Sequence, residues 1–177
     1  MSTNMKRLIA DTFMAMLATK SIDKITVKDL VEECRISRQA FYYHFKDTLD
    51  VIEWAMEQGL QEATEKSLRA ESPERAIEYF INLTNNKYEL IYRLLHSQKR
   101  EHLEKFFIQG IQAYLQKLIA SKAEDFDLQY GSIEVTLQFY TCGIAGLLLI
   151  HCGDKNLDAE KLASQICQMM RRSPRQN

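Results

Sequence analysis

The stretch from Thr26 to Asp47 constrains the fold of this chain more than any other segment. It is typical of two short helices joined by a tight turn, with Thr26 capping the first helix and Ser37 the second. In the first helix, apolar residues recur at the spacing of one helical face: Val27, Leu30, Val31 and Cys34. Two helices this short cannot be stable alone, so the pattern requires further helices to pack against them.

The second helix of this stretch divides into two faces. Phe41 and Phe45 lie one turn apart and are predicted to face the core. The opposite side suits a DNA groove, because Arg and Gln can read base edges whereas Tyr and Lys reach phosphates. We expect base contacts from Arg38, Gln39 and Tyr43. We expect contacts to the DNA backbone from Thr26, Arg35, Ser37, Tyr42, His44 and Lys46.

These residues resemble the N-terminal helix-turn-helix of the tetracycline-repressor (TetR/AcrR) family of bacterial transcription regulators. The resemblance rests on the capped helix ITVKDLVEE, on the turn before Ser37 and on the aromatic run FYYHF. It implies a DNA-binding regulator and not an enzyme, with a helix-turn-helix domain at residues 1–47 and a helical effector-binding and dimerisation domain at 48–177. Two positions depart from the family pattern: Arg35 stands where Gly is usual, and Thr48 where Lys is usual.

Two hypotheses about regulation follow from the resemblance. The first is a ligand-responsive homodimer that binds a palindromic operator as a repressor. The alternative is an activator whose C-terminal domain docks a partner protein instead of a metabolite. It arises because the run FYYHFKD, with Val51–Trp54 after it, also resembles regulators of dihydroxyacetone-kinase operons, some of which bind a protein. The effector is therefore an unidentified small molecule or a protein co-regulator.

The turn itself carries a prediction about Arg35. Turns of this type commonly hold one residue in the left-handed region, which Gly adopts without steric cost. A residue with a Cβ costs roughly 1–2 kcal/mol there. Arg35 is therefore predicted to be strained, unless the turn is remodelled so that its φ is negative.

The whole chain is predicted to be all-α. A helix over residues 4–19 is expected to brace the motif, and residues 20–24 are expected to form a loop. Ser72 followed by Pro73 marks the clearest helix start beyond the motif. Further helices are predicted at about 47–70, 72–85, 88–97, 99–122, 132–152 and 158–172, with a loop at 125–130 and a disordered tail at 173–177.

Composition narrows the class of protein. The net charge of −1 gives no global basic signal, and the charge alone fits an ordinary mixed-charge surface. Together with the motif, it favours specific, geometry-dependent DNA binding over a nonspecific mode. The four cysteines form no CxxC pair, as expected for free thiols in the cytoplasm. No signal peptide, metal-ligand spacing, cofactor motif or nucleophile elbow is present, so no enzyme activity, cofactor or metal is expected. The apolar stretch Phe139–Ile150 is too short to span a bilayer and is expected to be a buried helix.

The C-terminal half offers two further candidate sites. The first is a set of aromatic residues: Phe80, Tyr88, Tyr92, Phe107, Tyr114, Phe139 and Tyr140. These residues are interpreted either as the lining of an effector pocket between helices or as part of an ordinary core. Gly143 and Gly146 lie three apart in a predicted helix, which allows a second helix, intramolecular or from another chain, to approach closely. By the family resemblance we expect a dimer interface formed by Gly143, Gly146, Leu147, Ile150, Leu162, Ile166 and Met169.

Overall fold

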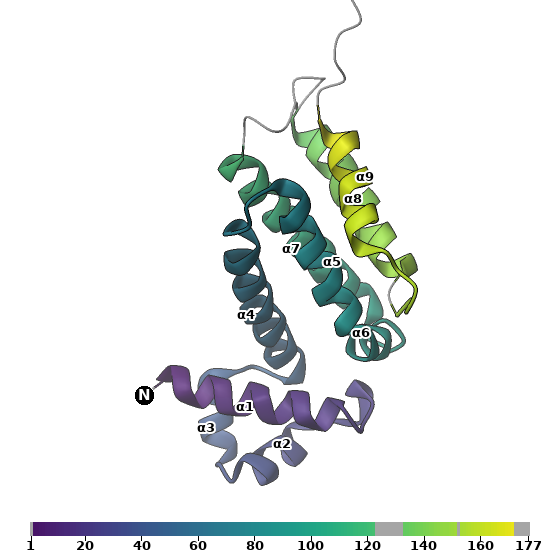
Figure 1. The fold of residues 1–177 in the computed structure, drawn as a ribbon. Helices are drawn as coiled ribbons and strands as arrows, with labels where there is room; N and C mark the ends of the chain where they lie inside the picture. The colour runs from purple at the N-terminus through teal and green to yellow at the C-terminus, as the bar shows by residue number, and fades with distance from the viewer. Residues whose placement is uncertain (1, 123–132, 152, 172–177) are drawn as a thin grey trace, which may run out of the picture. The chain divides into compact units, whose positions relative to one another are not determined.

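A computed structural model describes residues 2–122, 133–151 and 153–171 (Figure 1). The all-α prediction is confirmed, since every described element is helical. The elements are α1 (Ser2–Leu17), the short 3-10 helix η1 (Ile22–Lys24), α2 (Val27–Cys34), α3 (Arg38–His44), α4 (Thr48–Leu68), α5 (Pro73–Asn86), α6 (Tyr88–Leu95), α7 (Arg100–Ser121), α8 (Ile133–His151) and α9 (Ala159–Met170). The predicted loop at 125–130 and the predicted tail at 173–177 lie outside the described residues.

The predicted loop at residues 20–24 is in part helical. η1 forms there because Ile22 is 1% exposed and belongs to the core beside α1 and α2. The side chain of Asp23 also accepts a hydrogen bond from the Gln98 backbone N–H at 3.2 Å. This segment is therefore anchored at both its apolar and its polar residues.

The chain forms two compact units. The first comprises residues 1–59 and 89–106, and the second comprises residues 60–88 and 107–177. The first half of α4 packs with the helix-turn-helix because Val51 and Ile52 are fully buried in the same cluster as Phe41. The predicted boundary between residues 47 and 48 separates a DNA-binding part from an effector-binding part. The two compact units are defined by packing alone, so they do not test that boundary.

The first unit buries the apolar stripes of α1 to α4 in one cluster. Ile9 and Phe13 of α1, Leu30 of α2 and Phe41 of α3 are all fully buried. α1 contacts both α2 and α3, which confirms its predicted role as a brace (Figure 1). Leu94 of α6 extends the same cluster and is 4% exposed.

Two polar contacts in the first unit join residues that are far apart in the sequence. The Arg93 guanidinium donates to the Leu17 carbonyl oxygen at 3.4 Å. The imidazole of His102 contacts the carboxylate of Glu53. α4 and α7 thus bring together two residues that no local spacing in the sequence connects.

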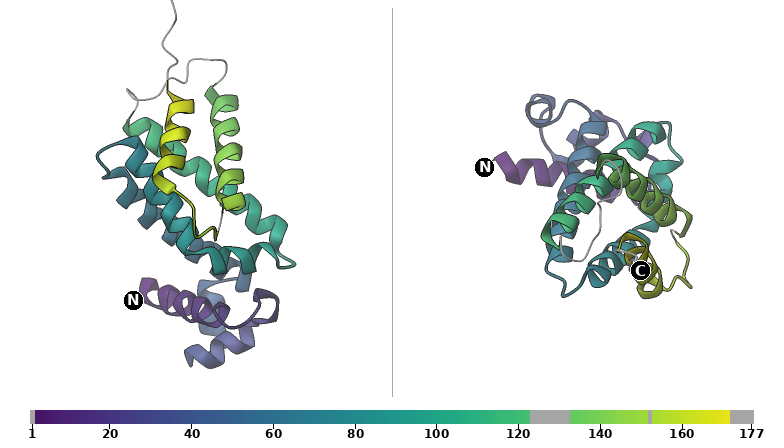
Figure 2. Two further views of the ribbon diagram at one scale, coloured as in Figure 1. Left: turned by 45° about the vertical axis from the view of Figure 1, so that its right-hand side comes forward. Right: turned by 90° about the horizontal axis from the view of Figure 1, so that it is seen from above.

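The second unit is organised around α5, which packs against both α8 and α9 (Figure 2). Its cluster combines α5 with the later parts of α4 and α7. The ends of the helices are tied by side chains: Asn85 accepts a hydrogen bond from the Gly153 N–H at 2.7 Å and donates to the Asp154 carbonyl at 3.2 Å. Gly153 has φ of 84°, and a Cβ there would meet the Tyr88 ring at 2.6 Å, so both conformation and space require glycine.

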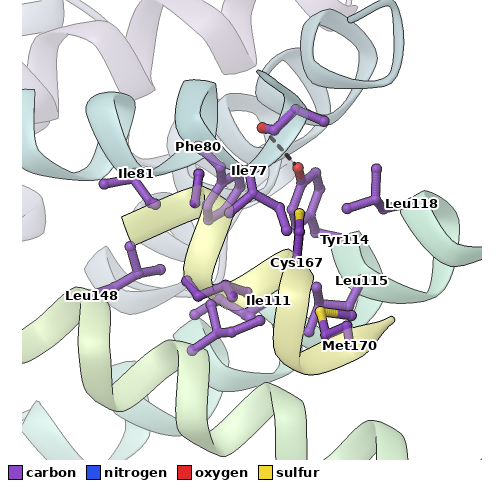
Figure 3. Close-up of a cluster of buried hydrophobic side chains, with 14 of the residues drawn as sticks. Ile77, Phe80, Ile81, Ile111, Tyr114, Leu115, Leu118, Leu148, Cys167 and Met170 are labelled. Carbon is purple, nitrogen blue, oxygen red and sulfur yellow. Dashed lines mark hydrogen bonds between the residues drawn. The ribbon is translucent and has the colours of Figure 1, made fainter. Parts of the chain in front are cut away.

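A buried polar group lies inside the second cluster (Figure 3). The hydroxyl groups of Ser67 and Tyr114 are 2.6 Å apart, and they lie 2.8 and 3.0 Å from the Ala76 carbonyl oxygen. Burial raises the pKa of the Tyr114 hydroxyl far above its ordinary value, and the hydrogen bond with Ser67 opposes part of that rise. Phe80 stacks on Tyr114 with ring centroids 4.4 Å apart, so this part of the core is filled.

α8, which contains the apolar stretch predicted to be a buried helix, has only one buried face. Leu137, Ile144 and Leu148 of α8 pack in the core, whereas Phe139 is 74% and Ile150 is 77% exposed. The window Glu134–His151 is long and apolar enough to cross a membrane, with a mean hydropathy of 1.2 and 28% of its residues buried. A single helix of this kind is weak evidence for a membrane span, because core helices pass the same test.

Candidate functional site

The candidate DNA interface begins with a capping box at the start of α2. The Thr26 hydroxyl oxygen accepts from the Asp29 N–H at 3.1 Å, and the Asp29 carboxylate accepts from the Thr26 N–H at 2.9 Å. The hydrogen bond from the Thr26 hydroxyl lowers the pKa of Asp29, and the Thr26 backbone N–H lowers it further. The predicted cap at Thr26 is confirmed, and the reciprocal pair fixes where α2 begins.

The turn after α2 has the strained geometry that the sequence predicted. Arg35 adopts φ 54° and ψ 44°, and it is the one non-glycine residue with positive φ in the described part of the chain. The Ile36 N–H donates to the Val31 carbonyl oxygen at 3.0 Å, and the Arg35 N–H donates to the Glu32 carbonyl at 3.2 Å. These two bonds define a Schellman motif, which holds its central residue in the left-handed region.

Two aromatic anchors fix α3 to the core. Phe41 is fully buried and Phe45 is 2% exposed, and their ring centroids lie 6.1 Å apart, which confirms the predicted inward face. The rings of Phe45 and Trp54 pack edge to face, with their centroids 6.1 Å apart. The Lys6 ammonium lies 5.4 Å from the centroid of the Phe45 ring. The Ser37 hydroxyl caps the helix by accepting from the Ala40 N–H at 3.0 Å.

The opposite face of α3 is open to solvent. Tyr42 is 57% and Tyr43 is 78% exposed, and Arg38 and Gln39 are exposed on the preceding turn. Residues at these spacings share one face of a helix. Thr26, Arg35, Ser37 and Lys46 are also exposed. His44 is half-buried and its ring meets the edge of the Tyr43 ring at 4.9 Å.

Two carboxylates hold the junction between α3 and α4. The Asp47 carboxylate accepts from the Leu49 and Asp50 N–H groups at 2.7 and 3.0 Å, which confirms Asp47 as the cap of α4. The Asp50 carboxylate accepts from the Lys46 N–H at 2.9 Å. Sequence reasoning missed Asp50, whose carboxylate accepts from the backbone one residue before the cap and so ties the end of the motif to α4. Thr48, where the family usually has Lys, is 8% exposed.

The structure does not gather the seven effector-pocket aromatics around one cavity. Phe80 and Tyr114 stack in the core, and Phe107 is half-buried against it. Tyr92 belongs to the first unit, where it stacks on His96 with centroids 3.9 Å apart. The rest are dispersed: Tyr88 lies over Gly153, Phe139 is exposed, and the Tyr140 hydroxyl donates to the Met169 carbonyl at 2.7 Å.

A small hollow lies elsewhere in the second unit. Its empty volume is about 180 Å³, including open solvent. None of the seven aromatics lines it; it is lined by Ile81, Thr84, Asn85, Leu148, His151, Leu157 and Leu162. Cavities that bind drug-sized molecules measure roughly 300–1,000 Å³, so this hollow is smaller than a typical site.

The predicted dimer residues differ in their exposure. Ile150 and Met169 are 77% and 63% exposed, whereas Ile166 is 3% exposed and packs inside the core. Ile166 was predicted to lie at the dimer interface. Its position departs from that prediction, because this side of α9 faces the core of its own unit. Gly143 is exposed, and the half-buried residues are Gly146, Leu147 and Leu162.

Comparison with known families identifies the N-terminal part of the chain. Residues 9–53 match the model described as bacterial regulatory proteins, tetR family. A search of curated proteins found no match. The matched segment contains the caps, the turn and the exposed face of α3 described above.

Solved structures share the fold over nearly the whole chain. A structure titled dihydroxyacetone kinase operon activator DhaS is 19% identical, with a TM-score of 0.69 and coverage of 94% of this chain and 93% of that one. A tetR-family regulator from Streptomyces coelicolor is 12% identical, with a TM-score of 0.64 and coverage of 95% and 79%. The repressor AlkX from Dietzia sp. is 14% identical, with a TM-score of 0.60 and coverage of 92% and 93%. At these identities the likeness shows a shared fold. The N-terminal segment is therefore similar to bacterial regulatory proteins of the tetR family, and the chain shares its fold with solved regulators of that family.

Proposed function

We propose that this regulator binds a two-fold symmetric operator as a homodimer and represses the promoter that the operator overlaps. The observation that carries the proposal is the exposed face of α3, where Arg38, Gln39, Tyr42 and Tyr43 stand opposite the buried Phe41. A helix anchored on one side and lined with donors and aromatic rings on the other fits the major groove. Because its target is DNA, we propose that the protein acts in the cytoplasm.

The residues of this face take different roles in the proposal. Arg38 and Gln39 read base edges, as their paired donors allow, and Tyr43 contacts bases beside them. The phosphate contacts come from Tyr42, His44 and Lys46 on α3 and after it, and from Arg35 in the turn. Thr26 and Ser37 add phosphate contacts at the helix N-termini, where the positive end of the dipole favours an anion.

Repression is the simplest form of regulation for this molecule. A dimer that covers a promoter blocks polymerase by occupancy, so repression requires no surface beyond the DNA interface and the dimer contact. Activation requires an additional surface for polymerase or for a partner protein. The structure titled an operon activator shares the fold at 19% identity, and this likeness supports the fold rather than the sign of regulation.

Response to a small effector would require the second unit to open. Phe80 and Tyr114 stack at 4.4 Å and fill the centre of the aromatic set. An effector that binds these aromatics must separate the two rings and expose the Ser67 hydroxyl, which is fully buried. We propose that effector binding, if it uses this set, is coupled to such a rearrangement.

Selection of DNA sites from a random pool tests the proposal. The expected product is an inverted repeat whose half-sites lie about 10 base pairs apart, or a multiple of that distance. The selected site is then placed over a reporter promoter. Lower expression in the presence of the regulator supports repression, whereas higher expression supports the activator alternative. A selected site without symmetry would contradict binding as a homodimer.

A further inference from the structure

The cap at the start of α2 contains one hydrogen bond more than a capping box requires. In such a box, the capping side chain accepts from an N–H of the first turn, and a side chain of that turn accepts from the N–H of the capping residue. Thr26 and Asp29 make both of these bonds. In addition, the Thr26 hydroxyl donates to Asp29 Oδ2 at 2.7 Å, and the same oxygen accepts from the Thr26 N–H at 2.9 Å. One carboxylate oxygen therefore holds both donors of Thr26.

The cap at the start of α3 is of a different kind. The Ser37 hydroxyl oxygen accepts from the Ala40 N–H at 3.0 Å, and the first turn of α3 contains no acidic residue. In the part of the chain that the structure describes, no group accepts the proton of the Ser37 hydroxyl. The two helices of the motif thus differ, because Thr26 is bound to an anion, whereas Ser37 keeps a free donor.

The anion on α2 lies where DNA is expected to approach. In a helix-turn-helix, the second helix enters the major groove and the first helix crosses the DNA backbone. Thr26 is exposed at the N-terminus of that first helix, and Asp29 is half-buried beside it. A phosphate that reaches Thr26 therefore meets a carboxylate that already accepts the two hydrogen bonds that this residue can donate.

Asp29 is charged at neutral pH. The hydrogen bond from the Thr26 hydroxyl lowers the pKa of its carboxyl group most, and the bond from the Thr26 N–H lowers it further. The positive charges of Lys20 and Lys28 act in the same direction. Both lysines are exposed, and the Lys28 ammonium also lies 3.9 Å from the Glu32 carboxylate. The same two ammonium groups can therefore face a phosphate once the Asp29 carboxylate moves away.

We propose that the Asp29 carboxylate competes with a DNA phosphate for the donors of Thr26 and so lowers the affinity of the motif for DNA. This competition rests on the DNA interface proposed above and adds to it a residue that opposes binding. Asp29 holds Thr26 in the free protein and must release it before a phosphate can take its place. Because phosphates are the same in every sequence, Asp29 weakens the binding of operator and of unrelated DNA alike. The base contacts of α3 then make up a larger share of the affinity for the operator.

A purely structural role for Asp29 predicts the opposite effect on DNA binding. An acidic side chain in the first turn stabilises a helix through the helix dipole. If this were the whole role of Asp29, neutralising it would loosen the start of α2, displace Thr26 and weaken the complex with DNA. Neutralising a competitor strengthens that complex instead. The sign of the change in affinity therefore distinguishes the two roles.

The first test compares Asp29→Gln with Asp29→Glu in the full chain. Glu and Gln are both usual residues at this position of a capping box, so the two variants differ in charge and not in the ability to cap. Asp29→Gln should bind the selected operator and an unrelated duplex roughly fivefold more tightly at low salt, which is the effect of one charge about 4 Å from a phosphate in water. This gain should shrink as salt is added. Asp29→Glu, which keeps the charge, should gain no affinity.

Asp11→Asn is the matched control for net charge, because Asp11 is an exposed acid on α1. It should leave the affinity unchanged. Fluorescence anisotropy measures each complex, and circular dichroism verifies that each variant is helical. An equal gain in Asp11→Asn, or an affinity of Asp29→Gln no higher than that of Asp29→Glu, overturns the competition but leaves the DNA-binding function standing. A wild type that binds neither duplex contradicts the proposed function itself.

The second test removes the Thr26 hydroxyl with Thr26→Val. The loss of DNA affinity should be at least about twofold larger in the Asp29→Gln background than in the wild type, because the hydroxyl is then free of the carboxylate. Ser37→Ala removes an uncontested hydroxyl and is the matched control, so its loss should be the same in both backgrounds. Equal losses for Thr26→Val in the two backgrounds overturn the competition at Thr26.

Discussion

The Ile36 N–H donates to the Val31 carbonyl oxygen at 3.0 Å, and this bond closes the turn of the DNA-binding motif around Arg35. The closure holds Arg35 at a φ of 54°, where a Cβ is strained. The same geometry leaves the Arg35 side chain exposed beside the N-terminus of α3. Strain at an exposed cation next to a DNA-reading helix motivates the first prediction.

Arg35→Gly should stabilise the protein and weaken DNA binding. The free energy gained by relieving the left-handed strain exceeds the cost of the added conformational entropy of the unfolded chain by about 1 kcal/mol. This difference raises the melting temperature by about 2–4 °C. Loss of the guanidinium should lower operator affinity most at low salt. Thermal melts and salt titrations measure both effects. Arg35→Ala is the control: it should lose affinity without the gain in stability. A lower melting midpoint for Arg35→Gly would contradict the strained turn.

Arg38→Ala and Lys46→Ala should impair DNA binding in different ways. A bidentate contact of Arg38 with guanine is worth about 1–3 kcal/mol of discrimination, so Arg38→Ala should relax the preference for one base pair. Lys46→Ala should weaken all sequences alike and reduce the salt slope by about one. Binding to operator variants at several salt concentrations separates the two. An unchanged sequence preference in Arg38→Ala would mean that the recognition face is assigned wrongly.

Gly146→Leu should loosen the homodimer, because a branched side chain keeps the paired helices apart. Overpacking of this kind costs roughly 1–3 kcal/mol, and sedimentation equilibrium would show a weaker association. Gln138→Leu places the same side chain at an exposed position of α8 outside the predicted dimer interface and should leave the association unchanged. A wild-type protein that is monomeric at micromolar concentration would refute the dimer, and with it this expectation.

Tyr114 should make the stability of the second unit fall at high pH. Burial raises the pKa of its hydroxyl above the unfolded value of about 10, so the native state holds this proton more tightly. Its contribution is therefore fully present below about pH 10 and is lost as the pH rises toward the folded-state pKa.

Tyr114→Phe tests this by removing the titrating group. It should lower the free energy of unfolding near neutral pH by about 1 kcal/mol, because the hydrogen bonds with Ser67 and Ala76 are lost. Urea unfolding above about pH 10 should then depend on pH less than in the wild type. Tyr43→Phe, at a 78% exposed position, is the control and should leave both values unchanged. An unaltered pH dependence in Tyr114→Phe would contradict the assignment.

The amino-acid sequence by itself determined the parts of this protein that depend on neighbours within a few residues. The caps at Thr26, Ser37 and Asp47 form as predicted because a side-chain oxygen meets an N–H two or three positions away. The inward pair Phe41 and Phe45 follows from helical periodicity alone. The sequence also predicted the left-handed conformation of Arg35, with a remodelled turn as the alternative, and the structure has the left-handed one.

Only the tertiary structure decided which distant residues meet and which surfaces stay open. His102 meets Glu53, and Asn85 ties the Gly153–Asp154 backbone, because separate helices place them together. Two aromatic residues that the sequence could not distinguish ended in different places: Tyr114 is buried in the core, whereas Phe139 is exposed on the surface. The exposed face of α8 was read from the sequence as a buried helix, because hydropathy measures how apolar a segment is, whereas burial depends on which of its faces the other helices reach.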